Sequence, residues 1–245
     1  MFAALLVWVA TATLLSYTIG RLWADAAAAK AFRYALAPGV IVHELSHVIG
    51  CIITGAKVRR VVFFDADGGS VTHTKPRMPL VGQAIISLAP VGGCTIALWG
   101  VWGLFAGRLG LDGRQLPLPV FSVAGGWEFW QLMRELFAES ARMLFSRQFL
   151  SLEAAAFLYL VLAFSICMAP SRTDLRHALL GLVVIAAIVT IIESTGLSSR
   201  AFGVRWSQAV TAIAWRAFSF SIMLLMLALV ASVPAALSIR IFGAK

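Results

Sequence analysis

Long apolar stretches separated by short polar segments run through the whole chain. Six of them are long enough, or nearly so, to cross a bilayer, because about 30 Å of hydrocarbon takes roughly 20 helical residues. The pattern therefore predicts an all-α polytopic membrane protein with about six transmembrane helices. The six stretches are residues 2–20, 35–54, 80–106, 150–169, 178–194 and 209–238.

The segment after the second stretch, residues 57–76, has a different pattern. β-Branched and aromatic residues flank the turn-rich sequence "DADGG" at residues 65–69. This arrangement is typical of two antiparallel strands joined by a short loop. We therefore expect a small β-hairpin between the second and third spans.

Residues 125–145, between the third and fourth spans, have the pattern of an amphipathic helix. One face is expected to be apolar and the opposite face polar, so we predict an interfacial helix along the membrane surface. The apolar face comprises Trp130, Met133, Phe137 and Leu144, and the polar face Glu128, Gln131, Glu135, Glu139 and Arg142.

The composition agrees with a membrane protein, because 60% of the 245 residues are hydrophobic and 13% are charged. The net charge of +9 comes from Lys and Arg residues spread over the loops. This distribution favours contact with a lipid bilayer and its anionic head groups over binding to nucleic acid. The three cysteines lie scattered in apolar stretches, which argues against a disulfide framework. We expect an integral, multi-pass protein of the cell (inner) membrane.

The chain contains no internal repeat or soluble segment and is expected to be a single transmembrane domain, residues 1–245. The first stretch, residues 2–20, lacks the basic segment that opens a signal peptide, so we interpret it as a retained span. Lys and Arg are divided almost equally between the two sides of the predicted topology. The positive-inside rule therefore does not assign an orientation.

Residues 43–47 read His-Glu-Leu-Ser-His inside the second apolar stretch. On a helix, His43 and His47 project from one face and can hold one metal ion. Glu44 can reach a water molecule beside that ion. In zinc hydrolases two imidazoles hold Zn²⁺ in this way, and the carboxylate takes a proton from the attacking water.

The alternative is that the three polar residues are packed by chance in a helix bundle. An ionisable side chain at the centre of a bilayer costs about 2.5–3.5 kcal/mol on insertion scales. Three of them in five positions are hard to retain unless a metal ion compensates them. We therefore predict a Zn²⁺ site with His43 and His47 as ligands and Glu44 as the general base.

The third ligand does not follow from this spacing. Asp65 and Asp67 are candidates, although turn formation explains their sequence equally well. Glu135 is a second candidate, on the predicted surface helix, where it also fits a solvated face. Asp174 is the candidate that we favour.

Asp174 follows a break in the fourth apolar stretch. Pro170 must interrupt that span, because proline lacks an N–H and clashes with the preceding turn. Irregular backbone at membrane depth is stable where protein or a polar cavity satisfies it, and a metal site needs such an environment. The alternative is that Ser171 and Asp174 form a capping box that opens the next helix.

In this order, the residues resemble the site-2 protease family, polytopic zinc metalloproteases that cut substrates within the membrane. The resemblance covers about residues 38–177. It rests on the motif at residues 43–47, the "TGAKV" that follows it, the hairpin, and an aspartate after a later, broken span. The sequence "SLAPVGG" at residues 87–93 is also similar to the Gly-Pro motif of the family.

The resemblance implies that His43, His47 and Asp174 bind zinc, that Glu44 is the general base, and that the substrates are membrane-spanning proteins. It also implies a protease-like core at residues 35–177, around which the other spans are added. These added spans are residues 2–20, 178–194 and 209–238.

Two departures from the family pattern leave alternatives open. Ala89 and Gly93 replace the Gly and Asn of a Gly-Pro-x-x-Asn pattern, and Asp174 lies in "PSRTDL" rather than in an Asn-Pro-Asp-Gly or Leu-Asp-Gly motif. A catalytically silent metal-binding membrane scaffold is therefore the second hypothesis, although a scaffold does not need Glu44. An ion transporter is the third, and the lack of repeated halves counts against it.

Overall fold

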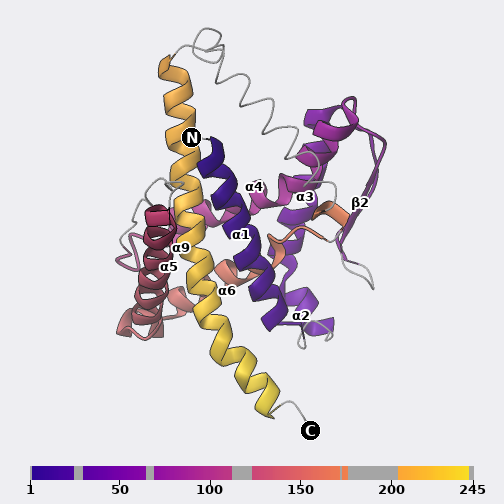
Figure 1. Ribbon diagram of the computed structural model, residues 1–245. Coiled ribbons are helices and arrows are strands. Elements are labelled where there is room, and N and C mark those ends of the chain that lie inside the picture. Colours follow the sequence, from indigo (N-terminus) through magenta and orange to yellow (C-terminus); the bar gives the residue numbers. More distant parts are fainter. Residues whose placement is uncertain are drawn as a thin grey trace.

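The computed structural model describes residues 2–24, 30–64, 69–111, 123–171, 173–175 and 204–242. Most of these residues are helical, and two short strands form a small sheet (Figure 1). The predicted class, a helical protein with one small hairpin, is confirmed at this level. The elements are α1 (Phe2–Leu22), α2 (Lys30–Ala35), α3 (Ala37–Thr54), β1 (Val58–Val62), β2 (Ser70–His73), α4 (Pro79–Phe105), α5 (Val123–Leu144), η2 (Arg147–Leu150), α6 (Leu152–Cys167) and α9 (Val204–Phe242).

Among the described residues, three helices are long and apolar enough to cross a membrane. They are α3, α4 and the part Trp215–Ser238 of α9, and they correspond to the predicted stretches 35–54, 80–106 and 209–238. The fourth stretch forms α6, an apolar helix of 16 residues, and the first forms α1. The fifth, 178–194, lies outside the described residues, so the count of six spans stays a prediction.

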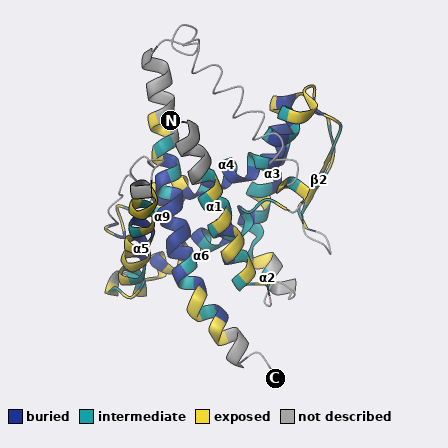
Figure 2. Cartoon of the chain, in the orientation of Figure 1, coloured by how far each residue is buried: buried dark blue, intermediate teal, exposed yellow. Residues whose placement is uncertain are grey.

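The helices pack around the middle of α9. Residues 221–228 of this helix are buried and share a core with Leu98 of α4 and Phe157 of α6. Figure 2 shows this buried centre in dark blue. α3 lies to one side of the bundle, packed against α4 and α6. The helix that carries the two histidines is thus held between two other apolar helices.

The predicted hairpin at residues 57–76 is confirmed. β1 and β2 pair antiparallel, with Val62 opposite Ser70 and Val58 opposite His73. The register shifts between Val58 and Arg60, as in a β-bulge. The turn at residues 65–68 lies outside the described part of the chain.

The hairpin runs back alongside α3 (Figure 1). At its base, the N–H of Arg77 donates to the carbonyl of Thr54, the last residue of α3, over 3.2 Å. Beyond the other end of β1, the ring of Phe64 lies 5.8 Å from the ring of Tyr34, which precedes α3. The hairpin therefore covers the side of α3 along most of its length.

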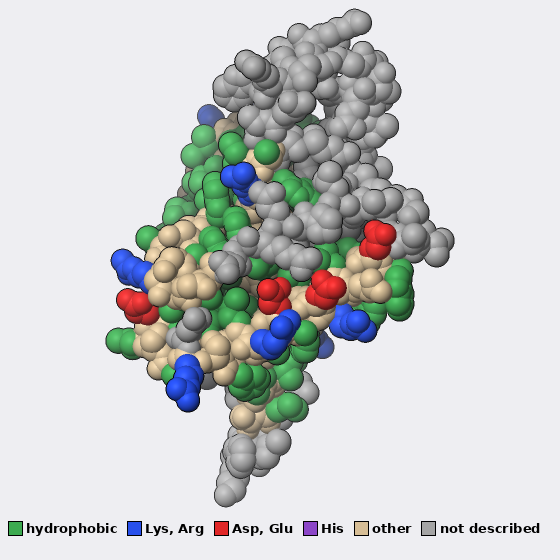
Figure 3. Space-filling view, turned by 90° about the vertical axis from the view of Figure 1, so that its left-hand side faces the viewer, with side chains coloured by type: hydrophobic (Ala, Val, Ile, Leu, Met, Phe, Trp, Pro, Cys, Tyr) green, Lys and Arg blue, Asp and Glu red, His purple; other side chains and the backbone are tan. Residues whose placement is uncertain are grey.

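The amphipathic segment at residues 125–145 forms α5, which packs against α9 (Figure 1). Its packing face overlaps only in part with the apolar face that the sequence predicts. Leu132, Met133 and Leu136 are buried, whereas Trp130 is 61% exposed. Figure 3 shows charged side chains of both signs among hydrophobic ones on this side of the molecule. The location of α5 at the membrane surface stays a prediction.

Candidate metal centre

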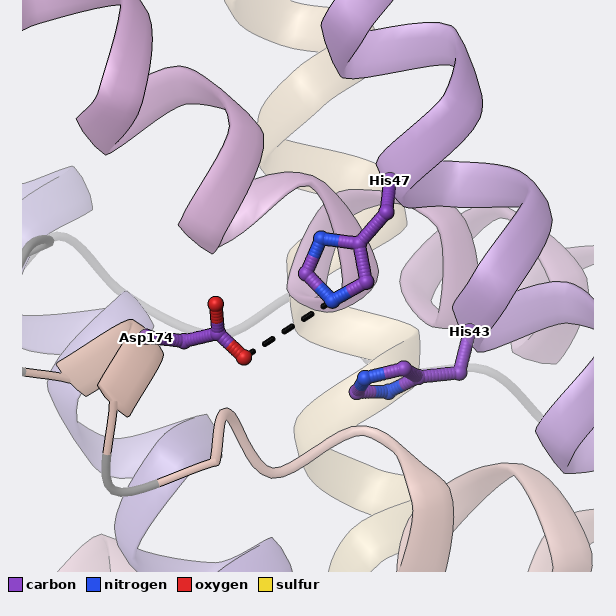
Figure 4. Close-up of side chains that lie close together, drawn as sticks. All are labelled: His43, His47 and Asp174. Atoms are coloured by element: carbon purple, nitrogen blue, oxygen red, sulfur yellow. Dashed lines mark ion pairs between the residues drawn. The ribbon is translucent and has the colours of Figure 1, made fainter. Parts of the chain in front are cut away.

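α3 places its two histidines on one face, as the four-residue spacing predicts. The centroids of the His43 and His47 rings lie 4.9 Å apart. Asp174, which follows the end of α6, points toward both rings (Figure 4), and its Oδ2 lies 3.7 Å from Nε2 of His47. One ligand atom from each of the three residues lies within 4.8 Å of the others. Residues more than 120 positions apart in the sequence thus meet at one point.

Backbone carbonyls orient both imidazoles. Nδ1 of His43 lies 2.5 Å from the carbonyl oxygen of Cys167, and Nδ1 of His47 lies 2.9 Å from that of Ile86. A carbonyl oxygen only accepts hydrogen bonds, so each Nδ1 must carry the proton. In the neutral rings, each Nε2 then keeps a free lone pair. This second-layer arrangement is typical of histidines that bind a metal through Nε2.

Two glycines allow these contacts by letting the helices approach closely. A Cβ on Gly50 would lie 3.0 Å from Cα of Ile86, and a Cβ on Gly39 would collide with the carbonyl of Ala163. Gly39 is four residues before His43, and Gly50 is three residues after His47. Each glycine therefore lies one helical turn from a histidine, on the side where that histidine reaches its carbonyl.

Asp174 faces the two histidines and also caps a helix, the two roles that the sequence left as alternatives. α6 ends at Cys167, ahead of Pro170, and residues 173–175 are again helical. The Ser171 hydroxyl accepts from the Asp174 N–H over 3.1 Å, and Oδ2 of Asp174 accepts from the Ser171 N–H over 3.3 Å, which forms a capping box. The hydroxyl also donates to Oδ2 over 2.6 Å. The capping hydroxyl holds the carboxylate while the carboxylate faces His47, so the two roles are compatible.

Glu44 follows His43 on α3 and is 5% exposed. A Cβ on Gly69 would lie 2.5 Å from Oε1 and 2.7 Å from Cγ of Glu44. The hairpin backbone just before β2 therefore rests directly on this side chain. Glu44 and the hairpin form one wall of the site, a contact that the sequence did not predict.

The three side chains fit a zinc ion. Two imidazole nitrogens and a carboxylate oxygen are ligands that zinc uses in catalytic sites. A tetrahedral zinc ion with bonds of about 2.0–2.2 Å holds its ligand atoms roughly 3.4 Å apart. The distance between His47 Nε2 and Asp174 Oδ2 is 3.7 Å, close to this value, and the three ligand atoms lie within 4.8 Å of one another.

The comparison with known protein families agrees with this arrangement. Residues 3–138, more than half of the chain, match the family described as Peptidase M50B-like. The chain belongs to this family. It is a site-2 protease family, so the resemblance inferred from the residues is confirmed. No curated protein and no solved structure matches the chain.

The family match contains His43, Glu44 and His47, and it ends before Asp174. The case for Asp174 therefore rests on its position in the structure. Glu135, the competing candidate, is exposed on α5, and the described group of possible metal ligands does not include it. Asp65 and Asp67 lie outside the described residues.

The structure gives a steric reason for one departure from the family pattern. At Gly93, where the pattern has Asn, a Cβ would collide with Oγ of Ser46 on α3. Ser46 is buried, and its hydroxyl donates to the carbonyl of Val42 over 2.6 Å. The space that an asparagine would need is thus filled by the neighbouring helix.

His73, on β2, is half-buried. Its Nδ1 lies 2.8 Å from the carbonyl oxygen of Thr74, so Nδ1 carries the proton of the neutral ring.

Proposed function

We propose that the protein is an intramembrane zinc metalloendopeptidase that hydrolyses peptide bonds of membrane-spanning proteins. The observation that carries the proposal is the group of His43, His47 and Asp174, in which both rings keep Nε2 for a metal beside a buried Glu44. Membership of the Peptidase M50B-like family supports it.

The proposed zinc ligands are His43, His47 and Asp174. When bound, the ion supplies Lewis acidity, which polarises a carbonyl and brings the pKa of a water molecule near 7. The chain's own groups set the geometry. The carbonyls of Ile86 and Cys167 orient the rings, and the hydroxyl of Ser171 orients the carboxylate.

Glu44 is the proposed general base. Its carboxylate would take a proton from the attacking water and deliver it to the nitrogen of the leaving amine. Because the side chain lies beneath the backbone of Gly69, it is shielded from bulk solvent. This shielding suits a site that must admit water only together with a substrate.

The hairpin is the proposed docking element for the substrate. A membrane-spanning helix must unwind before water can attack it, and pairing with a strand edge replaces the hydrogen bonds that are lost. The sequence offers two edges, residues 58–64 and 70–74. We favour 70–74, because the backbone immediately before β2 touches Glu44. An open strand edge in hydrocarbon would otherwise keep unsatisfied backbone groups.

The proposal also covers the domain organisation and the membrane location of the protein. We place the protease-like core at residues 35–177 of a single domain, 1–245, with the remaining spans added around it. The protein would be a multi-pass component of the cell (inner) membrane. Apolar helices long enough to cross a bilayer support this location.

Exchange of Glu44 for Gln tests the proposal. Glu44→Gln removes the base and leaves the three ligands, so we expect a zinc content equal to that of the unaltered protein and a loss of cleavage by a factor of about 10² or more. Comparison of membrane proteomes should reveal a single-span protein that accumulates in cells carrying the variant. Glu128→Gln, at an exposed position on α5, is the matched control and should leave the proteome unchanged.

A catalytically silent metal-binding scaffold is the alternative, favoured by the missing side chain at Gly93. It predicts zinc binding without turnover and identical membrane proteomes in cells with Glu44→Gln and the unaltered protein. A folded protein that binds no zinc would contradict both functions.

A further inference from the structure

α4 contains a proline in its interior, Pro90. In an α-helix, each N–H donates to the carbonyl four residues earlier. The carbonyl that would pair with residue 90 is that of Ile86. Because proline has no N–H, this carbonyl lacks its regular helical donor.

The carbonyl of Ile86 is the group that accepts the hydrogen bond from Nδ1 of His47, over 2.9 Å. Ile86 is 2% exposed and His47 is 8% exposed, so bulk water does not reach this contact. A buried carbonyl without a partner is costly, and a buried imidazole N–H needs an acceptor. Pro90 leaves the carbonyl of Ile86 without its helical donor, and Nδ1–H of His47 donates to this carbonyl instead.

His43 shows the same arrangement at a second position. Its Nδ1 bonds to the carbonyl of Cys167, the last residue of α6. The regular helical donor for that carbonyl would be the N–H of Ser171, which instead lies 3.3 Å from Oδ2 of Asp174. Each histidine therefore bonds to a carbonyl that receives no hydrogen bond from the N–H four residues later in the chain.

We propose that Pro90 is a positioning residue for the metal centre: it frees the carbonyl of Ile86, which then holds His47 in the tautomer whose Nε2 can bind zinc. The inference rests on the proposed zinc site. Two donors can compete for the carbonyl of Ile86: a backbone N–H at residue 90 and Nδ1–H of His47. With an N–H at residue 90, the carbonyl of Ile86 would have a helical donor, and the hydrogen bond to His47 would weaken.

The test is Pro90→Ala in the full chain, purified in lipid nanodiscs. Alanine restores the N–H and favours a regular helix, so the metal-free variant should be at least as resistant to thermal unfolding as the unaltered protein. Its affinity for zinc alone, measured by competition with a chelator, should be about 10 to 100 times weaker. If Pro90 had only a structural role, Pro90→Ala would instead lower the thermal stability and leave the affinity for zinc unchanged.

Pro234 provides the matched control, because it is also an interior helix proline and lies in α9. Pro234→Ala should leave the zinc affinity unchanged. Equal zinc affinities for Pro90→Ala and the unaltered protein would overturn the inference.

A second measurement separates this inference from the proposed function. The chain has four histidines, so ¹⁵N-labelled imidazoles can be resolved by NMR in the metal-free protein. We expect His47 to carry its proton on Nδ1 in the unaltered protein and to populate both tautomers in Pro90→Ala. If the unaltered protein binds no zinc, the proposed function fails, and the tautomers still decide the role of Pro90. An Nδ1–H ring in both proteins would contradict that role.

Discussion

At the residue scale, the site combines a short local motif with partners that lie far away in the sequence. His43, Glu44 and His47 share one helix, and the spacing alone predicts that both rings project from one face. Their hydrogen-bond acceptors are main-chain carbonyls, which every residue has. Pro90 marks the carbonyl of Ile86 as one without a regular helical donor, but the sequence does not show that His47 reaches it or that His43 reaches Cys167, so these contacts could not be predicted.

Gly69→Ala is expected to displace Glu44, the proposed general base. The new Cβ would lie 2.5–2.8 Å from three atoms of the Glu44 side chain, so the carboxylate must move. A shift of about 1 Å in a catalytic group can cost roughly 10² in rate. We expect kcat to fall by about this factor while the zinc content stays the same, since Glu44 is not a proposed ligand.

Lys75→Ala, at an exposed position just beyond the proposed docking edge, is the control for this substitution and should retain full activity. An unchanged kcat for Gly69→Ala would mean that Glu44 is not seated against the hairpin.

At the element scale, close contacts between helices decide what the site contains. α3 approaches α4 at Gly50 and at Gly93, and it approaches α6 at Gly39. Small residues allow the backbones of apolar helices to approach this closely, because no large side chain stands between them. The apolar pattern predicted each of these helices within a few residues. Which helices pack together, and where along their length, depends on whether the surfaces of the two helices have complementary shapes.

Gly93→Asn is expected to separate α3 from α4, because its Cβ would collide with Oγ of Ser46. Overpacking of this kind costs about 1–3 kcal/mol in the free energy of unfolding. Ser46→Gly in the same chain should remove the collision, so the double variant should be more stable than the sum of the two single effects. Thermal unfolding of the four proteins in nanodiscs measures this coupling. Additive effects would show that the two positions are not in contact.

At the scale of the whole molecule, the structure gathers basic side chains at the base of the hairpin. Hydrogen bonds join Lys57 to Thr74 there and Arg77 to Thr54. Exposed isoleucines at the end of α3, Ile52 and Ile53, lie next to this base. The exposed basic residues of the hairpin and its two flanks are Lys57, Arg59, Arg60, Lys75 and Arg77. An apolar rim beside a basic one is typical of a helix end at an anionic membrane surface.

The count of Lys and Arg over all connecting segments assigns no orientation, so we take as the hypothesis to test that the base of the hairpin, whose basic residues lie beside the end of α3, faces the cytoplasm. Cysteine labelling with a membrane-impermeant maleimide tests this orientation. Lys75→Cys should react in inverted membrane vesicles and not in right-side-out ones. Tyr34→Cys, an exposed position before the other end of α3, is the comparison and should show the reverse. Labelling of Lys75→Cys in right-side-out vesicles would contradict the assignment.

The sequence by itself determined the membrane-spanning character, the hairpin and the histidine pair. These features depend on composition and on short periodic patterns, which act within one element. The tertiary structure decided that Asp174 joins the histidines, that α5 packs through Leu132 and Leu136, and that Gly69 covers Glu44. Such contacts join residues far apart in the chain. They depend on how closely two backbones approach, which no local pattern specifies.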